Sequence, residues 1–290
     1  MTILSICQNA ALELGITYPS TVVTSSTGTT DRRLLAFAHR TGKDLRSSYD
    51  WVQLQKEYTI TLVAGQAEYA LPADFDQQLF RTHWDRNNHW ELLGPLSPTE
   101  WQQKKSGITT TSPRRRFRVK GLGTNKFFVD PTPSTGDAGA ILVFEYSSTS
   151  WVSPVIWTES TVFAANTYCA YNGNIYKTTA GGTTGSTAPT HTTGTVTDGG
   201  ILWAYQDIGY DQFRADTDFS VIDEKVVELG VIWRFLEASG LNFEQKKAEF
   251  DEAAKKEVTA LSGARTLSLV PVGASRSLGF WAVPDSGIGS

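Results

Sequence analysis

Cysteine is scarce in this chain of 290 residues, which contains only Cys7 and Cys169. The two stand far apart, in stretches of different composition, so no disulfide framework is predicted and synthesis in a reducing compartment fits. None of the four histidines has metal-ligand spacing with either cysteine. The sequence therefore predicts no metal and no other cofactor.

Long apolar runs and a strong charge of one sign are also missing. No stretch of about 18 apolar residues occurs, so no membrane span and no membrane partner are expected. The first ten residues lack a basic region and predict a helix, which argues against a secretion signal. The chain has 26 Lys and Arg against 30 Asp and Glu, a formal net charge of −4. This balance argues against a protein that wraps nucleic acid.

Motifs of catalysis are missing as well. Gly121-Leu-Gly123 lacks the rest of a phosphate-binding fingerprint, and neither a Gly-x-Ser-x-Gly elbow nor a His-Glu-x-x-His motif occurs. Two acid pairs could be considered for hydrolysis: Asp74 with Asp76, and Asp216 with Asp218. The first lies in a polar loop and the second precedes a helix, where acids favour the helix dipole. We interpret both pairs as structural and predict that the chain is not an enzyme.

Core-forming residues are plentiful, with 40% apolar residues, 9 Trp, 10 Tyr and 14 Phe. Apolar positions with a helical period predict helices over 2–14, 30–48, 220–239 and 243–262, with Thr2 and Ser220 as N-terminal caps. Between 51 and 150 the period changes to two. This change predicts strands over 58–62, 68–72, 78–84, 90–93, 115–120, 126–129 and 141–146, with a short helix over 97–105 and a hairpin connection over 121–125.

The stretch from 151 to 208 differs in composition from its surroundings. It is rich in Thr, Gly and aromatic residues, and between Ser160 and Ala204 only Lys177 and Asp198 are charged. Short strands are expected near 168–171, 174–177 and 201–205. We therefore predict a small all-β module inserted into a larger α+β protein.

The aromatic residues of this module allow two interpretations. They could form a stacking platform for a sugar ring or for a partner, or they could be the module's own core. We favour the core for Tyr176 and Trp203. Both interpretations stay open for Trp157 and Tyr171.

The densest basic run also allows two interpretations. Its cations could contact DNA phosphates or an acidic partner. Alternatively they form the polar face of a strand, with Phe117 and Val119 turned inward, which we favour because the overall charge gives no support to DNA binding. The cations of the run are Arg114, Arg115, Arg116, Arg118 and Lys120.

Residues 264–290 show neither a helical nor a strand period. They place apolar side chains among Gly, Ser and Pro, and an apolar tail without its own fold usually docks on another surface. We predict an extended docking arm, whose contact residues are Leu267, Leu269, Val270, Leu278, Phe280 and Trp281.

The order of these segments resembles the head-to-tail adaptor proteins of tailed phages. The resemblance covers most of 1–150 and 209–265. Its phrases include Ser48-Tyr49-Asp50-Trp51, Tyr69-Ala-Leu-Pro-Ala-Asp74-Phe75, Pro113-Arg-Arg-Arg-Phe117, Phe127-Phe-Val-Asp130-Pro131 and Phe213-Arg-Ala-Asp216-Thr-Asp218. The inserted module is similar to small carbohydrate-binding-like β-modules of phage virion proteins, through Tyr171-Asn-Gly-Asn-Ile-Tyr-Lys177 and Asp198-Gly-Gly-Ile-Leu-Trp203.

The resemblance implies a bundle of about four helices packed with a small antiparallel β-domain. The expected divisions are 1–50 (N-terminal helices), 51–150 (β-domain), 151–208 (insert), 209–263 (C-terminal helices) and 264–290 (docking arm).

It further implies a structural virion protein, assembled in the host cytoplasm as a ring commonly of twelve copies. Its partners would be the portal protein, through the docking arm, tail or nozzle proteins, and DNA only in passing through the channel. Two alternatives stay open: a glycan- or receptor-binding tail component, and a cell-wall hydrolase.

Overall fold

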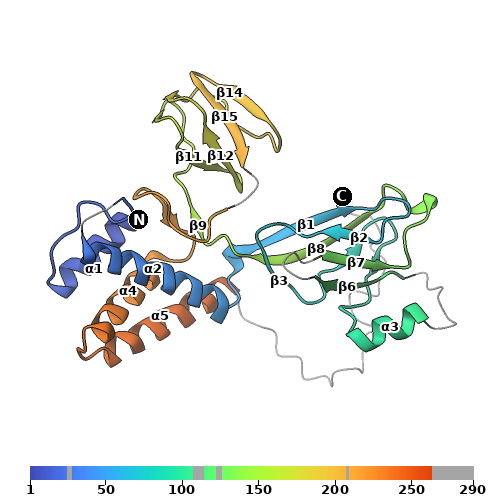
Figure 1. Ribbon diagram of the computed structural model, residues 1–290, viewed down its shortest axis with the longest axis horizontal. Helices are drawn as coiled ribbons and strands as arrows, with labels where there is room; N and C mark the ends of the chain where they lie inside the picture. The colour runs from blue at the N-terminus through green and yellow to red at the C-terminus, as the bar shows by residue number, and fades with distance from the viewer. Residues whose placement is uncertain (25–27, 107–113, 122–125, 207–208, 263–290) are drawn as a thin grey trace.

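The computed structural model describes residues 1–24, 28–106, 114–121, 126–206 and 209–262. Within these residues the chain is α+β, with five helices and several mostly small antiparallel sheets. Three bodies are visible in Figure 1. The helical body lies on the left, a β1–β8 lobe (residues 52–149) on the right, and a β10–β15 lobe (residues 154–206) above them.

Four helices form the helical body, and capping residues mark where two of them begin. Thr2 accepts the N–H of Ser5 through its hydroxyl, as predicted, and Gly15 ends the first helix in the left-handed conformation. Asp223, and not the predicted Ser220, begins the third helix by accepting the N–H groups of Lys225 and Val226. The helices are α1 (Ile3–Leu14), α2 (Thr29–Ser48), α4 (Glu224–Ala238) and α5 (Glu244–Ser262).

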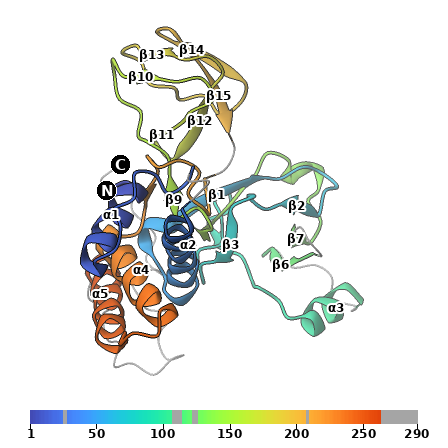
Figure 2. The same ribbon diagram turned by 60° about the vertical axis from the view of Figure 1, so that its left-hand side comes forward.

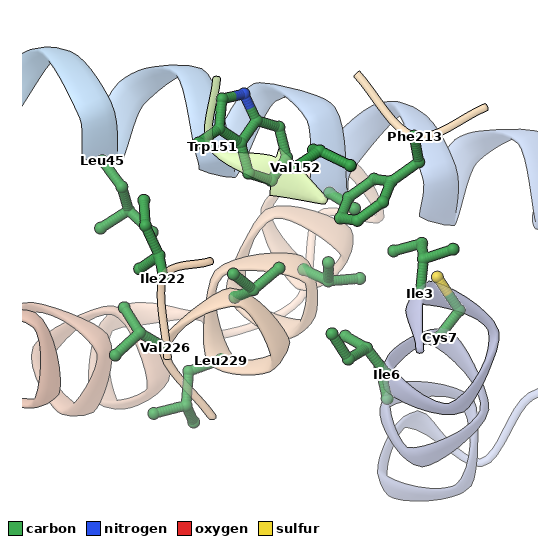
Figure 3. Close-up of a cluster of buried hydrophobic side chains, with 14 of the residues drawn as sticks. Ile3, Ile6, Cys7, Leu45, Trp151, Val152, Phe213, Ile222, Val226 and Leu229 are labelled. Atoms are coloured by element: carbon green, nitrogen blue, oxygen red, sulfur yellow. The ribbon is translucent and has the colours of Figure 1, made fainter. Parts of the chain in front are cut away.

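The core of the helical body also receives side chains from outside the helices (Figure 3). Trp151 is fully buried beside α2, where an added Cβ at Gly42 would lie 2.2 Å from its ring. The Trp151 indole N–H donates to the carbonyl of Asp211, and its ring meets Phe213 edge-on at 5.1 Å. The chain segments on both sides of the β10–β15 lobe are thus anchored in this core.

The β1–β8 lobe packs two antiparallel sheets around an aromatic core. One sheet has the order β1-β8-β4-β5, with β3 also paired to β8, and the other has the order β2-β7-β6. A short helix, α3 (Pro98–Ser106), flanks the second sheet and buries Trp101 against Phe128. The strands are β1 (Gln55–Thr61), β2 (Glu68–Ala70), β3 (Phe75–Gln78), β4 (Trp84–Asp85), β5 (Trp90–Glu91), β6 (Arg116–Lys120), β7 (Lys126–Asp130) and β8 (Ile141–Ser148).

The continuous strand predicted over 78–84 is wrong. The chain turns between β3 and β4, because Arg81 has a φ of 63° and the Thr82 hydroxyl donates to the carbonyl of Leu79. The predicted hairpin pairing of β6 with β7 is present, in register from Arg116 opposite Asp130 to Lys120 opposite Lys126.

The β10–β15 lobe is a second, smaller sandwich. A four-stranded sheet of order β11-β12-β15-β14 is covered on one face by the pair β10 and β13. A separate pair, β9 (Val152–Ser153) with β16 (Phe219–Ser220), lies at its base. The strands of the lobe are β10 (Val162–Phe163), β11 (Tyr168–Tyr171), β12 (Asn174–Thr178), β13 (Gly182–Thr183), β14 (Thr195–Asp198) and β15 (Ile201–Gln206).

The entry and exit of the β10–β15 lobe meet at the helical body, as Figure 2 also shows. The Val152 N–H donates to the carbonyl of Tyr210 at 3.0 Å. From the lobe, Ile175 is buried in the core of the helical body, and the Tyr168 ring meets Tyr210 edge-on at 5.4 Å. The lobe carries almost no charge, and apolar contacts hold it to the helical body.

Candidate functional site

The basic run does not form one cationic surface. Phe117 is buried and Val119 packs against the same core, as the strand interpretation predicts. Arg115 is buried in ion pairs with Asp85 and Asp137. Arg116 lies 3.5 Å from a carboxylate oxygen of Asp130, with only 11% of its side chain exposed.

Both Arg115 and Arg116 are largely covered and lie beside carboxylates of the same lobe, which argues against DNA contact by these two residues. The Lys120 ammonium lies 4.1 Å from the centroid of the Phe128 ring. Arg114 and Lys120 are exposed and Arg118 is half-buried. These three cations remain at the surface.

The aromatic residues of the β10–β15 lobe separate into two groups. Tyr176 and Trp203 are fully buried, as the core interpretation predicts. A stacking role for these two is wrong, because neither offers a ring face to a ligand. Trp157 and Tyr171 are half-buried, and their rings meet edge-on with centroids 5.6 Å apart.

Asp198 organises this lobe, a role that the sequence analysis missed. Its buried carboxylate accepts the Gly185 N–H at 2.7 Å, the Trp157 indole N–H at 2.9 Å and the Trp203 indole N–H at 3.3 Å. A lone acid in a nearly uncharged stretch was the available signal, because a buried charge persists only with such donors. Asp198 thereby fixes the orientation of Trp157.

The pair Asp74 and Asp76 has structural partners. The Asp74 carboxylate is buried and accepts hydrogen bonds from Lys56 at 2.7 Å, Tyr146 at 2.9 Å and Ser148 at 2.6 Å. Burial acts to raise the pKa of Asp74, but the bonds from Lys56 and Ser148 outweigh it and lower the pKa below its usual range. Asp76 forms an ion pair with Arg46 at 3.2 Å.

The pair Asp216 and Asp218 holds two loops. Asp216 accepts the backbone N–H groups of Val22 and Val23, at 2.9 and 2.8 Å. Asp218 accepts those of Arg214 and Ala215 at 2.7 and 2.9 Å, and burial raises its pKa. The structural interpretation of both acid pairs is confirmed, although the backbone partners of the second pair lie in loops rather than at a helix end.

The described residues contain no group of three His, Cys, Asp or Glu side chains placed to hold a metal ion. Cys7 and Cys169 are free and buried, and burial raises the pKa of each thiol to about 12. Among the described helices, none combines the length and apolar character needed to span a bilayer. The predicted docking residues Leu267, Leu269, Val270, Leu278, Phe280 and Trp281 lie outside the described residues.

The charged groups singled out in the sequence, where they are buried, are thus engaged in hydrogen bonds and ion pairs within the body to which each belongs. A family model described as SU10 adaptor protein matches residues 1–172, more than half of the chain. The chain belongs to this phage head-tail adaptor-type family. No curated protein matches it.

The family places the protein among the structural proteins of the virion. It implies interaction with other head and tail proteins of the phage. The matched range includes α1, α2 and the β1–β8 lobe, and it ends between β11 and β12 of the β10–β15 lobe.

Proposed function

We propose that the protein assembles as a homo-oligomeric ring beneath the portal and links the DNA-filled head to the tail. The observation that carries this proposal is the family match over residues 1–172. In this proposal the helical body, whose four helices share one core, forms the ring wall. The two β-lobes project from it in different directions, where they meet tail or neighbouring proteins (Figures 1 and 2).

The ring would act by shape and avidity. Weak contacts repeated around a closed ring, commonly of twelve copies, add up to a firm seal. DNA would pass through the channel without sequence-specific contacts. Assembly would take place in the host cytoplasm before the particle is complete.

The segment 264–290 is proposed to be the arm that docks on the portal. Its apolar residues alternate with Gly, Ser and Pro after a helix that ends at Ser262. Such a segment gains most by binding an apolar groove of another protein.

The test is binding to purified portal, followed by size-exclusion chromatography. The full chain is expected to elute with the portal as a ring. A chain ending at Ser262 is expected to stay folded by circular dichroism and to lose this co-elution. The double variant Phe280→Ala/Trp281→Ala should weaken binding at least tenfold, and Ser277→Ala/Asp285→Ala is its control. Equal binding by the truncated and full chains would refute the arm, and absence of binding by the full chain would refute the adaptor position.

A second candidate function is glycan or receptor binding by the β10–β15 lobe. It is favoured by the half-buried Trp157, which Asp198 fixes in orientation beside Tyr171. An aromatic face held in place can stack on a sugar ring. Retention on immobilised cell-wall glycans that is lost in Trp157→Ala, with the fold intact, would support this function.

A further inference from the structure

A pocket of about 430 Å³ lies where the three bodies of the chain meet, and we call it the junction pocket. Its walls come from the first residues of β1 and the turn before them, from the segments around β9 and β16, and from the β11–β12 hairpin of the β10–β15 lobe. Figure 1 shows β9 at this meeting point. Small-molecule sites have volumes of about 300–1,000 Å³ and occur preferentially between domains. The junction pocket has the size and the position of such a site.

Three buried oxygen atoms of the junction pocket have no hydrogen-bond partner within the described residues. They are the side-chain amide oxygen of Gln53 and the hydroxyl oxygens of Ser150 and Ser220. Only 9% of Ser150 is exposed, so its hydroxyl is withdrawn from bulk solvent. A buried polar group without a partner is unfavourable, and most such groups in folded proteins are paired. Three of them in one pocket point to a bound molecule as their partner.

The fold holds these three oxygens in place from separate segments. Ser150 lies between β8 and β9, where a Cβ added to Gly209 would be 2.4 Å from its hydroxyl oxygen. A side chain at position 209 would therefore displace this hydroxyl. Ser220 is fixed by the backbone pairing of β16 with β9, opposite Val152. Gln53 lies in the 3₁₀ turn that leads into β1. The arrangement is thus built before any ligand arrives.

The lining of the junction pocket favours an uncharged ligand. Lys56 is the one charged side chain among the described residues that line it, and its ammonium already contacts Asp74 at 2.7 Å. A charged ligand would lose its water there without gaining an ionic partner. The remaining wall is mostly apolar, with Ile156 56% exposed and Tyr171 half-buried.

A neutral ring that carries hydroxyl groups satisfies both parts of this lining. A hydroxyl can donate to the Gln53 amide oxygen, and it can donate to or accept from a serine hydroxyl. The C–H groups of the ring can lie on Ile156 and Tyr171. We propose that the junction pocket binds one neutral sugar unit of a glycan, through the three unpartnered oxygens.

This proposal rests on the second candidate function and adds a binding site to it. Trp157 does not line the junction pocket, but its ring meets Tyr171, which does, with centroids 5.6 Å apart. A glycan of several units can therefore extend from the junction pocket toward the Trp157 ring. A single free sugar, in contrast, reports on the junction pocket alone.

Binding of free sugars to the full chain tests the junction pocket. The probes are glucose, galactose, rhamnose and N-acetylglucosamine, and binding is followed by saturation-transfer NMR and by titration. We expect at least one of them to bind with a millimolar Kd, and glucuronate and glucosamine to bind at least tenfold more weakly than the best neutral sugar. If none of the four neutral sugars binds, the proposal is wrong. If the peptide acetyl-Ala-Ser-Ala-amide binds more tightly than every sugar, the pocket takes a peptide, which also overturns the proposal.

The unpartnered hydroxyls give different expectations for stability and for binding. In Ser150→Ala/Ser220→Ala the chain loses two hydroxyls that have no partner within its described residues, so its Tm should stay the same or rise. The same variant should bind the sugar at least tenfold more weakly. Its control, Ser20→Ala/Ser186→Ala, removes two exposed hydroxyls and should change neither property. A lower Tm, or sugar binding equal to that of the unchanged chain, contradicts the proposal.

Trp157→Ala separates the junction pocket from the functions proposed above. It should leave the binding of free sugars within twofold, because Trp157 is not part of the pocket wall. If free sugars are lost in Trp157→Ala and kept in the double serine variant, the sugar lies on the Trp157 ring and the junction pocket is refuted. If glycans are retained through Trp157 while no free sugar binds, the second candidate function stands without this pocket. A chain that binds sugar but no portal refutes the adaptor position and leaves the junction pocket standing.

Discussion

His83 shows how one buried residue sets a pH limit on the β1–β8 lobe. Its ring is stacked between Phe117, at 4.1 Å between centroids, and Phe144, at 5.0 Å. Nε2 has no hydrogen-bond partner in the described residues. Burial lowers the pKa of His83 from 6.5 to about 4, because the charged ring would lose its water in this aromatic stack.

The sign of the pH effect follows from this depressed pKa. Above pH 6.5 the imidazole is neutral in both the folded and the unfolded chain, so it adds no pH dependence. Between pH 6.5 and about 4 the unfolded chain binds the proton and the folded chain does not, so acid destabilises the fold. The full effect is about 3 kcal/mol. His83→Phe should remove this part of the acid sensitivity in urea titrations between pH 7 and 4, with His89→Asn as the surface control. If His83→Phe lost as much stability between pH 7 and 4 as the unchanged chain does, burial of His83 would not be the cause of the acid sensitivity.

Residue identity alone could not reveal such positions. His83 stands in a stretch that predicts a strand, and nothing local signals that it lies among phenylalanines from β6, β7 and β8. Arg115 is a similar case. Its partners Asp85 and Asp137 are 30 and 22 residues away in the chain, so the basic run left open both a strand's polar face and a surface for DNA or an acidic partner.

Among the elements, local signals predicted α1 well because its cap, apolar face and terminal glycine all lie within fourteen residues. The start of α4 was misplaced for a long-range reason. Ser220 pairs with Val152 in the strand pair β16 and β9, which leaves the cap to Asp223. The turn at Arg81 was missed because a left-handed arginine carries no sequence signature, unlike a glycine.

The contact between α2 and α4 gives a prediction at the scale of elements. A Cβ added to Gly230 would lie 2.2 Å from the Thr41 methyl group, so the two helices approach too closely for a side chain there. Helix propensity alone favours Gly230→Ala by about 0.5–1 kcal/mol. The clash should reverse the sign and destabilise the fold by about 1–3 kcal/mol, seen as a lower Tm. The double variant Gly230→Ala/Thr41→Ser removes the methyl group and should regain part of the loss. A Tm that rises in Gly230→Ala would mean that the helices separate freely.

At the scale of the whole molecule, the sequence identified three differently patterned bodies but not how firmly they are joined. Composition marked 151–208 as distinct, yet Trp151 and Val152 belong to the core of the helical body. Period-two patterning gives strands, but it does not say that Ile175 faces away from its own lobe. That information exists only once β12 is placed between β11 and β15 and against the helices.

This docking gives a prediction for removal of the β10–β15 lobe. Residues 156–207 are replaced by a short Gly/Ser linker, which is feasible because Val152 and Tyr210 are already hydrogen-bonded neighbours. Changing the loop length costs only about 1 kcal/mol. Loss of the Ile175 and Tyr168 contacts lowers the free energy of unfolding by a further few kcal/mol, since burying one large apolar side chain contributes about 1.5–3 kcal/mol. The shortened chain should fold with a lower Tm and still co-elute with portal.

The matched control for this deletion is the full chain with Tyr168→Ala/Ile175→Ala. It keeps the lobe but loses its apolar contacts with the helical body, so its Tm should fall by a similar amount. If both variants assemble on portal, the lobe is a surface for other partners and plays no part in the ring. If the control assembles and the folded deletion variant does not, the lobe itself contributes to the contact between subunits. In that case the apolar contacts of Tyr168 and Ile175 position a lobe that takes part in the subunit contact, and the ring wall includes this lobe in addition to the four helices.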